Sequence, residues 1–364
     1  MNKSVWAIAA SGMMIVAAGG CQSAGEQTAE AAEGEAAASQ SVLARDPMVP
    51  RRPKLAEPVQ SPVAVGVREQ AIDLLLQAAG SAEPLLRANA IEALHAAPER
   101  LEPVVRRGLG DENQGVRFVA AMTVGRQRLT SLAGRVEPLL ADDSMSVRAA
   151  AIYALRRCGR KADLNPLAGM IMSADPTVKA NAAMVLGELG DRSAVPMLRE
   201  AVGRESPRAS RARVKIVDLQ IAEAMVKLGQ ESQLEVIRAA LFAPVEQGEI
   251  TVLACQMCGQ LRDEAYAPSL LDKATREGRR QEPAEIRLAA AGALAQMDPR
   301  RAPIEVPMAY VGSDRPELRV QAAATLGSFP ADERVLESVR GLMDDPNPMV
   351  QVAAAGAILR LTGR

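Results

Sequence analysis

Two cysteines three residues apart form the most suggestive chemical motif in the chain. Cys255-Gln-Met-Cys258 has the spacing of redox-active and metal-binding cysteine pairs. A zinc site would need further ligands, and the sequence holds neither a second such pair nor two histidines. Both cysteines also fall where corresponding helices along the chain carry Ala or Leu. The pattern therefore favours buried cysteines that act as small apolar side chains.

The single histidine further restricts the chemistry that the chain can perform. His95 alone supplies neither a catalytic triad nor a histidine-rich metal site, and it falls near the end of an expected helix, where a partial positive charge would suit the helix dipole. The sequence contains no P-loop, no GxGxxG after a strand and no GxSxG. We therefore expect no catalytic residues, no metal and no cofactor, and predict that the chain is not an enzyme.

Composition favours a large helical protein. The chain has 364 residues, of which 48% are apolar but only 2% aromatic, so Ala, Leu, Val and Met must supply most of the core. The formal net charge of −1 gives no global attraction to nucleic acid, and we expect no nucleic-acid partner. Four cysteines in a chain of this length do not indicate a disulfide framework.

An internal repeat organises the chain from residue 67 onward. Its clearest copy is Asp175–Gly190, and related copies begin at Asp142 and Asp345. Each copy contains an apolar anchor, followed after four positions by a near-constant Ala and after eight by a Leu-like residue, which places all three on one helical face. The anchors, spaced by 30 to 39 residues, are Leu86, Val116, Val147, Val178, Val217, Ile250, Ile286, Leu318 and Val350.

The signature Asp-x-x-Val-Arg/Lys-x-x-Ala-Ala-x-x-Leu-Gly is best matched at 175–187 and approached at 142–155 and 314–327. It resembles HEAT repeats, and more narrowly the HEAT-like repeats first named for phycobilisome lyases. The resemblance implies an all-α, right-handed α-solenoid of about nine helical pairs over residues 67–364. It implies no reaction. Deoxyhypusine hydroxylases share the repeat type, but their paired His-Glu iron motifs are missing here.

The N-terminal 21 residues predict an export signal. Lys3 precedes an apolar run that is too short to span a bilayer comfortably. The run ends Ala18-Gly19-Gly20-Cys21, which resembles the lipobox of bacterial lipoproteins, although that family usually has Leu where Ala18 stands. The resemblance implies lipidation of Cys21, and Gln22 favours the outer membrane. An ordinary cleaved signal is the alternative.

Residues 22–66 are rich in Ala, Glu and Pro and lack an apolar stripe, so we expect a flexible tether. The sequence thus predicts three regions, 1–21, 22–66 and 67–364. It also predicts a lipid-anchored protein of the bacterial envelope, facing the periplasm or the cell surface.

One face of the second helices is a candidate protein-binding surface. Positions two and six after the anchor lie opposite the anchor face, on the expected concave side of the solenoid. Apolar or aromatic residues stand there in units two to four, beside arginines, which is typical of interface anchors. The same residues could instead form the core between repeats. The set is Phe118, Met122, Tyr153, Met184, Arg126, Arg156 and Arg157.

Two other groups of basic residues are open to two interpretations. Longer turns at 203–215 and 272–285 are either functional or tolerated surface loops, and the first of them carries Arg204, Arg208, Arg211 and Arg213. A basic residue also follows most anchors, as either a track for acidic ligands or a ladder that pairs with the aspartates of adjacent turns. This row is Arg87, Arg117, Arg148, Lys179, Arg287 and Arg319.

The favoured function is a non-catalytic envelope lipoprotein that binds a protein partner through its solenoid surface. One alternative is an enzyme or enzyme subunit of the lyase-like or metal-dependent type. Another is a binder of acidic glycans or polymers through the basic edge of the expected concave face.

Overall fold

The computed structural model describes residues 62–204 and 209–363, and all regular structure in these ranges is helical. The expected signal peptide with Cys21, the tether as far as residue 61, and Arg208 lie outside the described residues. The first helix begins at Pro62, five residues before the expected start of the repeats at Val67.

Nine pairs of α-helices follow one another along the described chain, which confirms the predicted fold. In each pair a first helix is followed by a turn and a second helix. The pairs are α1 (Pro62–Ala78) and α2 (Pro84–Ala93), α3 (Pro98–Gly108) and α4 (Gln114–Gln127), α5 (Ala133–Val136) and α6 (Met145–Arg157), α7 (Asn165–Ile171) and α8 (Pro176–Leu189), α9 (Val195–Ala201) and α10 (Arg211–Lys227), α11 (Leu234–Ala240) and α12 (Gly248–Leu261), α13 (Ala267–Thr275) and α14 (Ala284–Met297), α15 (Glu305–Met308) and α16 (Pro316–Leu326), and α17 (Glu333–Gly341) and α18 (Pro348–Thr362).

Polar side chains fix where several of the second helices begin. Asp175 precedes α8, and its carboxylate accepts hydrogen bonds from the backbone N–H groups of Thr177 and Val178 at 2.7 and 3.4 Å. Asn113 caps α4 in the same way, and Pro176 starts α8 where no backbone donor is needed. These caps explain why the turns that follow the first helices are rich in Asp, Asn and Pro.

The repeat register predicted the core. The anchors Val116, Val147 and Val350 are buried, and the alanines four positions later have no exposed surface in the same units. Small residues let successive second helices pack closely. A Cβ atom added at Gly187 of α8 would lie 2.8 Å from the Ala224 Cα of α10. The Gly of the signature is therefore required for close helix contact.

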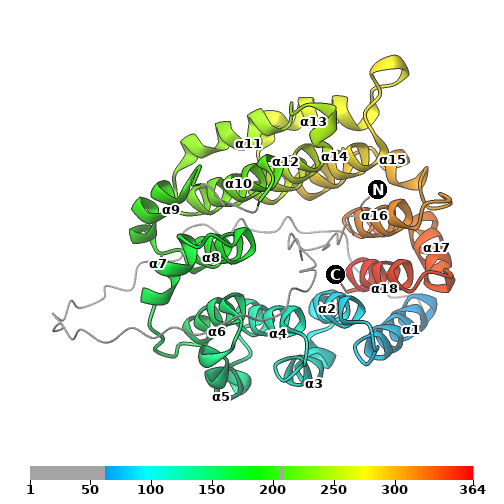
Figure 1. Ribbon diagram of the computed structural model, residues 1–364. Helices are drawn as coiled ribbons and strands as arrows, with labels where there is room; N and C mark the ends of the chain where they lie inside the picture. The colour runs from blue at the N-terminus through cyan, green and yellow to red at the C-terminus, as the bar shows by residue number, and fades with distance from the viewer. Residues whose placement is uncertain (1–61, 205–208, 364) are drawn as a thin grey trace, which may run out of the picture.

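The repeats close into a ring, which the sequence did not predict. The second helices face its centre and the first helices lie outside (Figure 1), and the last helix, α18, packs against both α1 and α2. At this seam Arg68 of α1 donates hydrogen bonds to the carbonyls of Leu359 at 3.3 Å and Ala96 at 3.0 Å. Closure replaces the open, extended concave surface expected of a solenoid.

None of the helices in the described ranges combines the length and the apolar character needed to span a bilayer.

Candidate functional site

The row of basic residues is mainly a structural ladder. Three arginines at the position after the anchor each grip the aspartate of the next turn with two hydrogen bonds of 2.7 to 2.9 Å, in the pairs Arg87–Asp111, Arg117–Asp142 and Arg319–Asp345. The guanidinium of Arg319 holds the pKa of Asp345 below its usual value. The same aspartates accept a backbone N–H two residues later, for example that of Asn347. These contacts confirm the ladder interpretation for the three pairs.

Two of the remaining members of the row donate hydrogen bonds to backbone carbonyls. Lys179 donates to the Arg204 carbonyl at 3.3 Å, and Arg287 donates to the Ala274 carbonyl at 3.0 Å. Arg148 differs, because its Nε is buried without a hydrogen-bond partner. A continuous track for an acidic ligand is therefore not present along this row, since most of its charges are already occupied.

Three of the predicted binding residues meet on the inner face of the ring. Arg126 of α4 reaches across α6 to Glu188 of α8, with Nε–Oε2 and Nη2–Oε1 distances of 3.1 and 2.5 Å. Tyr153 of α6 also hydrogen-bonds Glu188, and the Met184 sulfur lies 3.8 Å from Arg126 Nη2. The sequence register thus brought Arg126, Tyr153 and Met184 together correctly. It missed Glu188, which stands ten positions after its anchor, as Arg126 does.

Electrostatics makes this cluster a stable, charged unit. Burial alone would raise the pKa of Glu188, but the nearby Arg126 guanidinium outweighs it and the pKa stays below its usual value. Lys227 of α10 adds a further positive charge next to Glu188. Burial raises the pKa of the Tyr153 hydroxyl, which therefore stays protonated and can act as a donor. The arrangement can hold α4, α6 and α8 together, and no nucleophile is activated by it.

The prediction that the apolar residues of this set form a binding surface is wrong for most of them, because they are buried. Phe118, Met122 and Tyr153 are all buried, so they belong to the packing between repeats, and Met184 is half-buried. Gly125 makes room for the Tyr153 ring, because a Cβ atom there would lie 2.4 Å from a ring carbon. Burial follows from the tight packing of α4 against α6, which a single helical wheel does not reveal.

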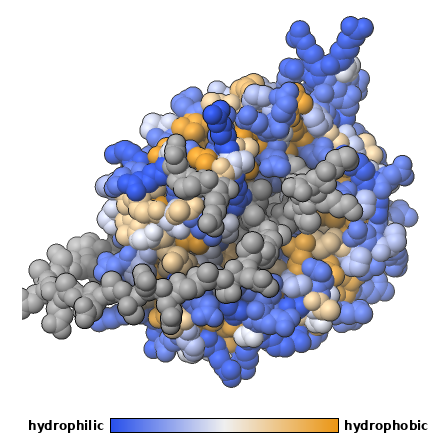
Figure 2. Space-filling view, in the orientation of Figure 1, coloured by the Kyte–Doolittle hydropathy of each residue, from blue (hydrophilic) through white to orange (hydrophobic). Residues whose placement is uncertain are grey.

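The remaining predicted arginines do not converge on one site. Arg156 is exposed and Arg157 is half-buried at the end of α6. Arg204 pairs with Glu200 at 2.5 Å, Arg213 donates to Thr177 Oγ1 at 3.4 Å, and Arg211 is exposed at the start of α10. The other long turn, between α13 and α14, projects from the ring (Figure 1) and is strongly hydrophilic (Figure 2).

The cysteine pair is structural. Cys255 and Cys258 have no exposed surface, and burial raises the pKa of Cys258 to about 12, so neither side chain is a ready thiolate. Within residues 62–204 and 209–363 no group of three or more His, Cys, Asp or Glu side chains is placed to hold a metal ion.

The expectation of a partly charged His95 is wrong. Its Nε2 lies 2.9 Å from Thr123 Oγ1, and burial lowers its pKa to about 4, so the imidazole is neutral at pH 7. The inner packing of α2 against α4, and not the helix dipole, sets its protonation.

Sequence reasoning missed an exposed apolar patch on the outside of the ring. The side chains of Phe242 and Val245, in the turn between α11 and α12, are 64% and 74% exposed. We call Phe242 and Val245 the unit-six patch; Val236 of α11 and Leu271 of α13 are exposed as well. The Lys273 ammonium lies 5.3 Å from the Phe242 ring centroid, which links α13 to the turn. The signal was available, because Phe242 is one of only three phenylalanines and lies in a turn.

Comparisons with known proteins agree with this architecture. The family profile of HEAT repeats matches residues 72–156, 164–245 and 274–359. Among solved structures, the complex of CpcE and CpcF of phycocyanin lyase from Nostoc sp. PCC7120 is similar at 18% identity, with a TM-score of 0.36, covering 65% of this chain and 91% of that chain. The comparison with curated proteins gives no match.

The structural match corrects the prediction that the chain is not an enzyme. The similar structure is that of a phycocyanin lyase complex, so the lack of a catalytic motif is no ground for that prediction. At this identity and TM-score the likeness transfers no reaction or substrate to the chain.

Proposed function

The chain belongs to the HEAT-repeat family, and from this premise we propose that it is a ring-shaped scaffold that binds a protein partner through the unit-six patch. The single observation that carries the proposal is the exposure of Phe242 and Val245. Large apolar side chains that remain in water on a folded repeat protein are typical anchors of protein interfaces. The inner-face residues are weaker candidates, because most of them are buried.

The charges around the patch favour a protein over a membrane surface as its partner. Glu246 is exposed beside the patch, and Glu235 is exposed there in an ion pair with Arg238. The Glu246 carboxylate would repel the anionic head groups of a bilayer. The nearby cation Lys273 is already paired with Glu282 at 2.7 Å. We therefore expect a partner surface that offers apolar side chains together with Lys or Arg.

We further propose that Cys21 carries a lipid that holds the ring at a bacterial envelope membrane. The apolar run before Cys21 and the small residues around it support this part of the proposal. A Cys21→Ser variant is expected to leave the membrane fraction and to lose incorporation of a labelled fatty acid. Equal labelling of both proteins would contradict lipidation at this residue.

The patch is tested with a Phe242→Ser, Val245→Ser double variant in crosslinked pull-downs from the native envelope. Because both side chains are exposed, the melting temperature should change by no more than a few degrees, whereas capture of a specific polypeptide should fall at least about tenfold. That polypeptide is then purified and its affinity for both proteins is measured directly.

The matched control is Met145→Ser, which replaces another exposed apolar side chain, at the start of α6. The control should keep the partner. An unchanged set of captured polypeptides in the double variant, or equal loss in the control, would remove the unit-six patch as the binding surface.

A further inference from the structure

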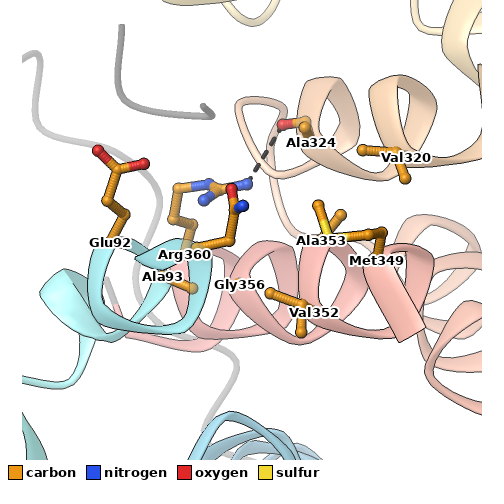
Figure 3. A pocket seen from close by; sticks show the side chains of 10 residues that line it. Glu92, Ala93, Val320, Ala324, Met349, Val352, Ala353, Gly356 and Arg360 are labelled. Atoms are coloured by element: carbon orange, nitrogen blue, oxygen red, sulfur yellow. Dashed lines mark hydrogen bonds between the residues drawn. The ribbon is translucent and has the colours of Figure 1, made fainter. Parts of the chain in front are cut away.

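A small pocket lies at the seam where the ring closes. It is formed by α2 of the first unit together with α16 and α18 of the last two (Figure 3). Val320, Met349 and Val352 supply apolar walls, and the side chains of Glu92 of α2 and Arg360 of α18 stand at the other end of the pocket. Residues separated by most of the sequence thus share one pocket, which exists only because the ring is closed.

Glu92 is the unusual group in this pocket. Only 7% of the residue is exposed, and both carboxylate oxygens are buried without a hydrogen-bond partner. The positive charge that acts on it is that of Arg126, whose guanidinium is itself bound to Glu188. A buried carboxylate without a donor is unfavourable, so the site is incomplete without a group that donates hydrogen bonds to it.

We propose that this seam pocket binds a primary ammonium group on a short alkyl chain, with Glu92 as the partner of the ammonium. The alkyl chain lies against the apolar lining of the pocket, to which Ala93, Val352 and Ala353 contribute. The ammonium supplies three donors to a carboxylate that has none. The group belongs either to a free amine or to a lysine side chain of a polypeptide.

The size of the pocket selects this ligand class. Its cavity volume is about 40 Å³. Pockets for whole small molecules are larger, at roughly 300–1,000 Å³. A compact ammonium fits such a space better than a planar guanidinium does. Arg360 does not compete for Glu92, because its Nη2 donates to the Ala324 carbonyl at 3.3 Å, as the dashed line in Figure 3 shows.

Binding has a pH signature set by the groups around the pocket. Burial raises the pKa of Glu92 to about 7, against the opposing effect of Arg126 of α4. Arg360 of α18 stays charged throughout, and the α16 residues that line the pocket, Val320 and Ala324, do not titrate. Because the ammonium pairs with the ionised carboxylate, affinity should rise as the pH increases from 6 to 8.

The test uses the whole chain and n-butylammonium chloride as the probe, with binding measured by calorimetry and by the rise in melting temperature. We expect saturable binding, at least about tenfold weaker binding of the neutral isostere 1-butanol, and a loss of at least about tenfold in Glu92→Gln, as for a charge-assisted hydrogen bond. Glu83→Gln, at the exposed N-cap position of the same helix, is the matched control and should bind as the unaltered chain does.

A second variant and a second probe complete the test. Ala353→Leu fills the pocket with apolar atoms, leaves Glu92 in place and should also abolish binding. Tighter binding of a blocked lysine peptide than of n-butylammonium assigns the site to a polypeptide side chain, and the reverse order assigns it to a free amine. Lack of saturable binding, equal affinity for 1-butanol, or unchanged binding in Glu92→Gln would overturn the proposal and leave a pocket that holds only water.

Discussion

At the scale of single residues, Glu92 and His95 show how the inner face of the ring controls protonation. They lie three positions apart, at the end of α2 and in the short turn of helix that follows it. Burial disfavours the charged form of both, and it raises the pKa of Glu92 to about 7 and lowers that of His95 to about 4. Two ionisable side chains are therefore held neutral in mildly acidic solution.

The two shifts act on stability in opposite directions. Between about pH 4.5 and 7 the folded chain keeps the Glu92 proton that the unfolded chain releases, so Glu92 makes stability fall as the pH rises. Between about pH 4 and 6.5 His95 is protonated in the unfolded chain but neutral in the folded chain. Because the unfolded chain binds more protons, His95 makes stability rise with pH.

A Glu92→Gln variant should reveal the contribution of Glu92 to the pH dependence of stability. The variant removes the unfavourable ionisation, so its stability relative to the unaltered chain should increase by roughly 3 kcal/mol at most between pH 4.5 and 8. Urea unfolding at pH 4.5 and pH 8 measures the difference. A stability difference that is the same at both values would show that Glu92 is not held neutral by burial.

At the scale of helices, two devices position successive units. The arginine after the anchor fixes the next turn by gripping its aspartate, as Arg117 does with Asp142. The Gly of the signature then lets the second helices approach each other, as Gly187 does with Ala224. The ladder orients the turns whose aspartate is paired in this way, and the glycine sets the distance between inner helices where it stands.

Gly187→Ala tests the second device. Alanine is the better helix former by about 1 kcal/mol. Its Cβ would however lie 2.8 Å from the backbone of α10, and this overpacking should lower the free energy of unfolding by about 1–3 kcal/mol in total. Gly169→Ala in α7 is the control, because no atom lies within 4 Å of the added Cβ. Chemical denaturation of both variants gives the comparison, and a stabilised Gly187→Ala would contradict close packing at this crossing.

At the scale of the whole molecule, closure changes what the repeats can do. An open solenoid has two free ends, and each unit depends on its neighbours in sequence. Here α18 covers α1 and α2, so the first and last units stabilise each other. The seam also creates the pocket around Glu92, and the unit-six patch stays exposed in the turn between α11 and α12.

Gly356→Leu should open the seam. A Cβ atom at Gly356 of α18 would lie 3.0 Å from the Ala93 Cβ of α2, so a leucine forces the two helices apart. Hydrogen exchange should then speed up together in residues 62–93 and 348–362. Gly341→Leu in α17, where an added Cβ meets nothing within 4 Å, is the control. Faster exchange confined to residues 348–362 would indicate ends that do not support each other.

The sequence by itself determined the class and register of the fold. Regular spacing of anchors such as Val147 and Val178, each followed by Ala, requires amphipathic helices in pairs, because only a 3.6-residue period places these positions on one face. It also determined that Cys255 and Cys258 are core residues. The same periodicity grouped Arg126, Tyr153 and Met184, although their partner Glu188 was not identified.

Only the tertiary structure decided closure, burial and the exposed surface. Whether α18 meets α2 depends on small rotations between units that add up around the ring, and local periodicity carries no information about their sum. The same packing buried Phe118 and Tyr153, which a helical wheel leaves facing the centre, and kept Phe242 in water. The protonation of Glu92 and His95 followed from that packing, because desolvation depends on neighbours that are distant in sequence.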